Sequence, residues 1–199
     1  MIKRLFHCSV ALMVLSLVAG CGPVAMPAVS MYMITNPKPV SLSNNTKTAK
    51  TLLVSNIVAE PGYQSAAMIY SQTPYKLQSF SRNKWGAPPA QMILPLLVNT
   101  MRGANYFKAV VSPPFAGSTT YRLDVRLLKL QQEFSLSQSA VRLEVQATLM
   151  SNISGRLVAS RQFRVVVPAF GRDPYSGVVA ANKAVALIDK EVKDFVLTQ

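Results

Sequence analysis

The sequence has very few of the side chains that metal sites and nucleophilic enzymes use. Its 199 residues include one histidine, His7, and two cysteines, Cys8 and Cys21. His7 and Cys8 lie in an N-terminal segment that we expect to be removed, and Cys21 is expected to be acylated. Such a chain offers no His or Cys metal site, no Ser-His or Cys-His pair and no disulfide chemistry. We therefore expect neither a metal nor a cofactor.

Acidic residues are also scarce, with eight Asp and Glu against 21 Lys and Arg. A hydrolase that uses two carboxylates would have to draw on these eight, and most of them fall where a solvated strand or helix face would place them. Residues 81–84 fit the S-x-x-K pattern of penicillin-recognising enzymes, but they end a predicted strand and no K-T-G follows. We interpret the tetrapeptide as a coincidence.

The start of the chain has the three parts of a secretory signal. Lys3 and Arg4 precede an apolar run over residues 5–19, which is shorter than the roughly 20 residues of a membrane-crossing helix. The sequence LVAGC at 17–21 resembles the lipobox of bacterial lipoproteins, which predicts a signal peptide at 1–20 and lipidation of Cys21. The alternative is an ordinary signal peptide followed by an accidental cysteine.

The exported chain is expected to be one anchored domain. Residues 21–30 form a small-residue tether that, fully extended, reaches at most ~30 Å, and residues 31–199 are long enough for a single core. Gly22 stands where an aspartate commonly retains lipoproteins in the inner membrane, which favours the outer membrane. Losing Lys3 and Arg4 lowers the formal charge from +13 to +11.

Alternating apolar and polar residues predict long antiparallel strands in the second half of the chain, at 121–127, 141–149 and 157–167. The alternation breaks at Leu127-Leu128 and around Arg161, where we expect a β-bulge or the edge of the sheet. Shorter strands are predicted at 31–35, at 51–59 as one buried strand, at 68–72 and 75–81 as a hairpin, and at 107–111.

Two amphipathic helices complete the predicted fold. The first follows Pro88-Pro89, and Pro95 should kink it or delay its start. The second spans about 176–197, with Asp173 or Ser176 as its cap. Its apolar stripe comprises Val178, Ala181, Val185, Ile188, Val192 and Phe195, and Asp189 is expected off this stripe. Together these elements predict a two-layer α+β domain, in which both helices cover one face of a mainly antiparallel sheet.

The basic residues suggest a contact surface. Arg122, Arg126, Arg142 and Arg164 all occupy polar positions of the long predicted strands, so neighbouring strands would form one basic face. Such a face could bind anionic headgroups or an acidic partner, or it could serve only solubility. Trp85, just before the first helix, is interpreted as a hydrophobic plug or as a partner-facing residue. We expect no nucleic acid as a partner of an exported protein.

Short marks along the exported chain resemble the ABC-type transport auxiliary lipoproteins, companions of lipid transporters of the mammalian-cell-entry (MCE) class. These marks follow Cys21 in order: YMI at 32–34, PGY at 61–63, MIY at 68–70, YKL at 75–77, WGAP at 85–88, YRL at 121–123, GRLVA at 155–159 and AANKA at 180–184. Two features depart from the family pattern: Ser71 replaces a usual basic residue, and a long polar linker follows Tyr32.

The resemblance implies a fold similar to the amino-terminal domain of TolB, no enzymatic activity, and a supporting role in moving lipids between membranes. An MCE-domain protein would be the partner, the lipid anchor would provide the membrane contact, and the domain could form homo-oligomers. Two other classes stay open, a structural envelope lipoprotein that binds cell wall or outer-membrane assembly components, and a periplasmic hydrolase.

Overall fold

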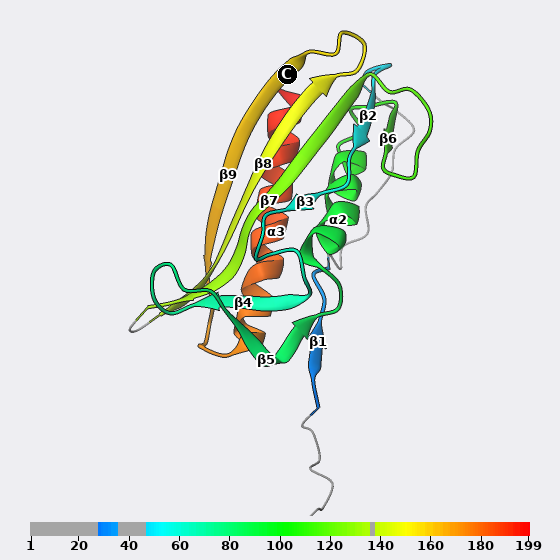
Figure 1. Cartoon of the computed structure of the whole chain (residues 1–199). Coiled ribbons are helices and arrows are strands. Elements are labelled where there is room, and N and C mark those ends of the chain that lie inside the picture. The colour runs from blue at the N-terminus through cyan, green and yellow to red at the C-terminus, as the bar shows by residue number, and fades with distance from the viewer. Residues whose placement is uncertain (1–27, 36–46, 136–137) are drawn as a thin grey trace, which may run out of the picture.

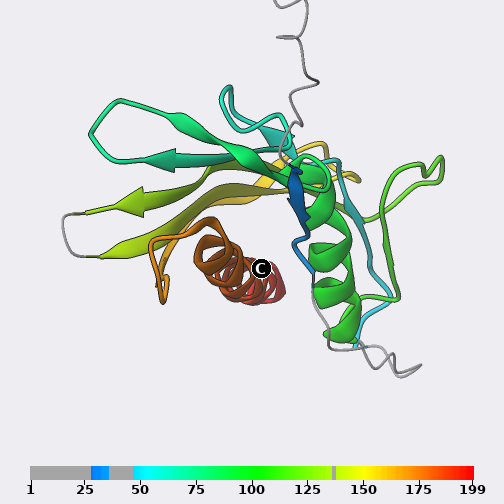
Figure 2. The ribbon, with the colours of Figure 1, turned by 90° about the horizontal axis from the view of Figure 1, so that it is seen from below.

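The computed structural model describes residues 28–35, 47–135 and 138–199. Cys21, the predicted signal peptide and most of the predicted tether lie outside these residues. Within them the chain forms one open, mixed sheet with two helices on one face (Figures 1 and 2). The predicted α+β fold with two helices on one face is therefore confirmed.

Three long antiparallel strands form the centre and one edge of the sheet. They are β7 (Tyr121–Phe134), β8 (Ser139–Ser151) and β9 (Leu157–Pro168). The pairing of β7 with β8 shifts register between Leu127 and Lys129, which confirms the predicted break. On β9 the register shifts opposite Leu149 and Met150 and not at Arg161. Among the described strands β9 pairs only with β8, so it forms an edge, which was the other predicted option.

The other side of β7 is shared by three short parallel strands that follow one another along it. These are β2 (Thr51–Val54), β3 (Val58–Ala59) and β4 (Ala67–Ser71). The single strand predicted over 51–59 is therefore wrong. Polar Ser55 and Asn56 interrupt the apolar run, and asparagine is disfavoured inside strands. The backbone N–H of Ser55 still donates to the carbonyl of Leu123 at 3.0 Å, so the chain stays beside β7 across the break.

Three further strands extend the sheet: β5 (Gln78–Trp85) pairs antiparallel with β4, β1 (Ser30–Tyr32) runs parallel to β5, and β6 (Ala109–Val111) runs parallel to β2. The predicted hairpin exists, but its second strand begins at Gln78 and not at Tyr75. Tyr75 has a φ of 66°, a left-handed turn conformation that is incompatible with a strand. The sheet is thus antiparallel in its long ladders and in the β4–β5 hairpin, and its other short ladders are parallel.

The helices are α2 (Pro89–Gly103) and α3 (Pro174–Leu197). The helix α2 begins at Pro89 and contains Pro95, so the predicted later start is wrong. Asp173 caps α3, because its carboxylate accepts a hydrogen bond from the backbone N–H of Ser176 at 3.0 Å. The helix α3 packs on β8 and β9, while α2 lies between α3 and the β2–β6 edge (Figure 2).

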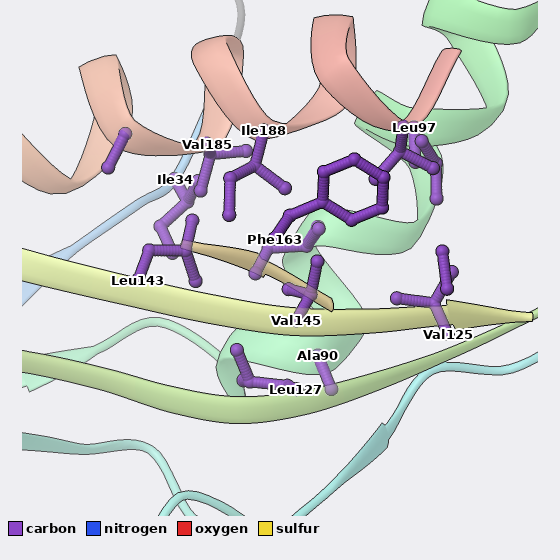
Figure 3. Packing of buried hydrophobic residues seen from close by; sticks show 14 of the residues in the cluster. Ile34, Ala90, Leu97, Val125, Leu127, Leu143, Val145, Phe163, Val185 and Ile188 are labelled. Atoms are coloured by element: carbon purple, nitrogen blue, oxygen red, sulfur yellow. The ribbon is translucent and has the colours of Figure 1, made fainter. Parts of the chain in front are cut away.

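The core lies between α3 and the sheet. Leu143 and Phe163 on the strands face Val185 and Ile188 on α3 (Figure 3). Ile34, just after β1, is also buried in this cluster, so the N-terminal segment is part of the domain core. Neither helix in the described part of the chain is long and apolar enough to cross a membrane.

Candidate functional site: an arginine–carboxylate face and a groove between the helices

The four predicted arginines do lie on one face of the sheet. Leu123, Leu127, Leu143 and Phe163 lie in the core beneath the helices. Their strand neighbours therefore point to the opposite face, because successive side chains of a strand alternate. These neighbours include Arg122, Arg126, Arg142 and Arg164. The structure brings together the residues that the alternation had selected.

Every one of these arginines is paired with a carboxylate. Arg122 Nε lies 3.0 Å from Asp124, Arg126 pairs with Glu60, Arg142 Nε lies 2.8 Å from Glu133, and Arg164 Nε lies 2.9 Å from Glu144. Four arginines thus face four carboxylates, and the predicted basic face is largely neutralised. The strand pattern predicts that Asp124 and Glu144 offset part of this charge. It does not include the other two carboxylates, because Glu60 comes from the loop after β3 and Glu133 from beyond the β7 bulge.

The centre of this face is a partly buried polar network. Glu133 accepts hydrogen bonds from both Arg142 Nε at 2.8 Å and Nη2 at 2.9 Å, and another from Gln131 Nε2 at 2.9 Å. The hydrogen bonds from Arg142 hold the pKa of Glu133 below its usual value. The hydroxyl of Tyr63 donates to Gln131 Oε1 at 2.5 Å, and burial raises the pKa of Tyr63 to about 12. Glu144, almost fully buried, lies between Arg142 and Arg164.

Sequence reasoning did not select Tyr63, Gln131 or Glu133. The signal was present in the Gln-Gln-Glu run at 131–133, where polar residues continue along a strand that is otherwise apolar at every second position. The bulge at Leu127 and Lys129 changes which of these positions face outward. Without the location of the bulge, their face could not be assigned.

Replacing Arg142 with glutamine is expected to destabilise the domain by about 1–3 kcal/mol at pH 7, because Glu133 and Glu144 lose a partner in a partly buried site. The side chains of Arg142 and Glu133 are 28% and 31% exposed. The pKa of Glu133 is lowered in the folded state, so its contribution is present above the ordinary carboxyl pKa and is lost as pH falls. The difference between variant and wild type should therefore shrink towards pH 3, as measured by urea unfolding.

Arg122→Gln is the matched control for that experiment. It removes the same charge from the same face, but Arg122 and Asp124 are more exposed, so the cost should be within about 0.5 kcal/mol. Equal losses for the two variants at pH 7 would contradict the assignment of Arg142 to the centre of the network.

Trp85 is buried, with 5% of its surface exposed. It ends β5 directly before α2, and its backbone N–H donates to the carbonyl of Ala66 at 2.8 Å. Of its two interpretations the structure supports the hydrophobic plug, and the indole is not presented to a partner.

The S-x-x-K tetrapeptide at 81–84 lies within β5. The S-x-x-K mechanism places the lysine one helical turn after the serine, and an extended strand does not provide that arrangement of Ser81 and Lys84. Within the described ranges, no three His, Cys, Asp or Glu residues are grouped in a way that could hold a metal ion.

A second candidate site is the groove between α2 and α3. It contains a cavity of about 260 Å³ lined by Thr35, Leu96, Thr100, Asn182, Lys183, Val185, Ala186 and Asp189. Asn182 ties the N-terminal segment into the groove, because its Oδ1 accepts from the Thr35 N–H at 2.8 Å and its Nδ2 donates to the Met33 carbonyl at 3.2 Å. In Figure 2 this blue segment runs beside α2 on the side that faces α3.

Asp189 in this groove corrects the sequence prediction. It was placed off the apolar stripe of its helix, yet only 4% of it is exposed. The reason is that α3 is covered twice, by the sheet on one side and by α2 on another, so its buried arc is wider than one stripe. Burial raises the pKa of Asp189 to about 8.

Comparison with protein families identifies the chain. Residues 32–193 match the family described as the ABC-type transport auxiliary lipoprotein component. The chain belongs to this family. The family is one of lipoproteins that assist an ABC transport system, so the protein is an envelope lipoprotein with an auxiliary role in transport.

Solved structures show the same fold as this auxiliary lipoprotein at low sequence identity. Protein XCC0632 from Xanthomonas campestris is 22% identical, with a TM-score of 0.71 over 86% of this chain and 93% of that one. An uncharacterized protein is 16% identical, with a TM-score of 0.68 over 85% and 99%. The hypothetical protein CT253 from Chlamydia trachomatis is 4% identical, with a TM-score of 0.50 over 76% and 100%. No curated protein sequence matches the chain.

Proposed function

We propose that this protein is a non-enzymatic lipoprotein, anchored in the outer membrane through Cys21, that docks an MCE-type ABC lipid transport system. The observation that carries the proposal is the family match over residues 32–193, which spans nearly the whole predicted domain. Only the short predicted tether separates the lipobox at 17–21 from that domain, so the anchor and the docking domain belong to one chain. Lipids would move between the inner and outer membranes with this domain as a fixed periplasmic component.

The position of β1 supports an anchored arrangement. The strand begins at Ser30, so the nine residues from Cys21 to Val29 connect the anchor to the sheet and reach at most ~30 Å. The chain enters at the end of the domain where α3 begins (Figure 1). Met31, Phe170 and Tyr175 are exposed there, and the rings of Tyr32 and Tyr175 lie 6.2 Å apart. This end of the domain would therefore face the membrane or a neighbouring subunit.

The exposure of the arginines supports a role in guiding a partner to this surface, and less a role in holding it tightly. The side chains of Arg122, Arg126 and Arg164 stay between 44% and 59% exposed even though each is paired. Exposed charges of this kind act mainly on the rate of encounter and on partner choice. Beside them, the edge of β9 away from β8 pairs with no other described strand, and it could accept a second copy or a partner strand.

The partner proposal is tested by pull-down of the MCE-domain protein of the same organism at low and high salt. The wild type should capture the MCE-domain protein at both salt concentrations. The double variant Arg122→Glu, Arg126→Glu should capture less of it at low salt, and the amount it captures should depend less on salt concentration. The side chains of these two arginines are 44% and 58% exposed, against 28% for Arg142, so the double variant should keep a melting temperature close to that of the wild type. Arg142 is unsuitable here because its charge stabilises the fold.

Two outcomes of this pull-down would contradict the proposal. Failure of the wild type to capture any MCE-domain protein would remove the transport partner. Unchanged capture by the double variant at both salt concentrations would remove the arginine face from the docking mechanism and leave the β9 edge as the surface to test.

Cys21→Ser is expected to release a folded protein from the membrane fraction. Each buried methylene contributes about 0.8 kcal/mol, so acyl chains and not the globular surface should supply the membrane affinity. Fractionation of wild type and variant measures this, and near-wild-type circular dichroism of the variant shows that the fold survives. A variant that still sediments with membranes after a salt wash, or a wild type found in the inner membrane, would contradict the anchoring proposal.

A further inference from the structure

Two charged residues are buried in the described part of the chain. Glu144 pairs with arginines, whereas Asp189, in the groove between α2 and α3, forms no ion pair with a described residue. Asp189 is 4% exposed and lines the 260 Å³ cavity. Among the described residues, none donates a hydrogen bond to its carboxylate and none forms an ion pair with it. Its oxygens are not among the fully enclosed, unsatisfied atoms of the described residues, so they open onto the cavity. A carboxyl group on so buried a residue is still costly without a partner, and a protein that needed only packing at this position would place an apolar side chain there.

The surroundings of Asp189 define what the cavity could hold. From α2 the cavity receives Leu96 and Thr100, and from the N-terminal segment Thr35, all of them uncharged. The one cation that lines it is Lys183, an exposed residue six positions before Asp189 on α3, which is about 9 Å along a helix axis. Lys190 and Lys193 of α3 lie outside this lining, and Lys193 pairs with Asp194 at 3.1 Å.

We propose that this cavity binds a zwitterionic phosphoethanolamine group, with its ammonium at Asp189 and its phosphate beside Lys183 at the mouth. A primary ammonium supplies the donors that the Asp189 carboxylate lacks, and Thr100 adds a hydroxyl to the lining of the same cavity. The flexible stem of Lys183 allows its ammonium to reach a phosphate at the mouth. Leu96 and Ala186 would contact the short ethylene linker.

The same group occurs free and as the headgroup of phosphatidylethanolamine. The lipid source rests on the proposed role in lipid transport, whereas binding of the free group does not. The site also lies on the helical side of the sheet, away from the arginine–carboxylate face. Loss of one function therefore leaves the other measurable.

Calorimetric titration of the full chain in detergent with free phosphoethanolamine tests the site. Because the ammonium binds the ionised carboxylate, affinity should rise about tenfold per pH unit below the pKa of Asp189. Asp189→Asn should abolish binding while leaving the protein folded. Lys183→Gln should weaken the binding of phosphoethanolamine but not that of ethanolamine. Asp194→Asn, at an exposed position of α3, is the control and should bind phosphoethanolamine as the wild type does.

Titration with phosphatidylethanolamine in nanodiscs separates the two sources. Binding of both forms supports the site with a lipid ligand, and binding of the free group alone supports it with a soluble one. The proposal is overturned if the wild type binds neither form at millimolar concentration between pH 6 and 9, if Asp189→Asn binds equally well, or if ethanolamine binds as tightly as phosphoethanolamine. A negative pull-down of the MCE partner would leave these results unaffected.

Discussion

Ile188→Asp is expected to leave the domain unfolded at neutral pH. Ile188 is 2% exposed and lies between α3 and the sheet, close to Val185 and Leu143 (Figure 3). The substitution removes a large apolar side chain from the core and places an unpaired carboxylate there, a combined cost of more than about 4 kcal/mol. Small domains are stable by only about 5–15 kcal/mol, so this loss removes most of the margin. Circular dichroism and thermal melting measure the effect.

Leu187→Asp is the matched control for the core. It makes the same change one residue earlier on the same helix, where the leucine is 49% exposed. We expect a melting temperature close to that of the wild type. If both variants melt alike, the face of α3 that packs on the sheet has been assigned wrongly.

Asp189→Asn is expected to stabilise the domain at neutral and alkaline pH. The pKa of Asp189 is raised to about 8 in the folded state from an ordinary value of 3.8, so the folded protein holds this proton more tightly than the unfolded chain. Wild-type stability should therefore fall as pH rises from about 4 to about 8 and level off above, by an amount on the order of several kcal/mol. The asparagine variant cannot lose that proton and should not show this decline.

Urea unfolding of both proteins at pH 5, 7 and 9 measures this difference. The curves should lie close together at pH 5 and separate by pH 9, with the variant the more stable. Asp194→Asn controls for the loss of a carboxylate on α3 and should follow the wild type. Parallel pH profiles for wild type and Asp189→Asn would mean that Asp189 finds a compensating partner in solution.

The two pH effects in this protein have opposite signs. Glu133 has a lowered pKa and stabilises the fold above the ordinary carboxyl pKa, whereas Asp189 has a raised pKa and destabilises it as the pH rises. Together they predict that stability is greatest near the ordinary carboxyl pKa, because the contribution of Glu133 is lost below it and the penalty from Asp189 grows above it. A wild-type profile with its maximum above pH 8 would contradict the assignment of Asp189, and a profile that does not fall at the acid end would contradict that of Glu133.

Local pattern predicted several elements correctly for an identifiable reason. The strands around Leu123 and Leu143 and the helix around Ile188 each alternate or repeat over enough residues that one period dominates. The break at Leu127 was visible because two leucines in succession cannot both face the core of a regular strand. The cap at Asp173 depends only on contacts within one turn.

Other features could not be predicted because they depend on neighbours that are distant in the sequence. Arg126 pairs with Glu60, which is 66 residues away, and the alternation that selected Arg126 contains nothing about the loop after β3. The strand predicted over 51–59 is divided because β7 accepts successive short partners along one edge. Trp85 had two interpretations until its burial excluded a surface contact.

The sequence by itself determined the fold class, the long strands, both helices and the family, because periodicity and short ordered marks are properties of neighbouring residues. Only the tertiary structure decided how charge is distributed. The arginine face is neutralised because the sheet brings carboxylates from separate strands and loops beside it. Asp189 is buried because α2 covers a side of α3 that the helical period marks as polar. Burial of a second helix face depends on which element packs there, and no local pattern within α3 encodes that.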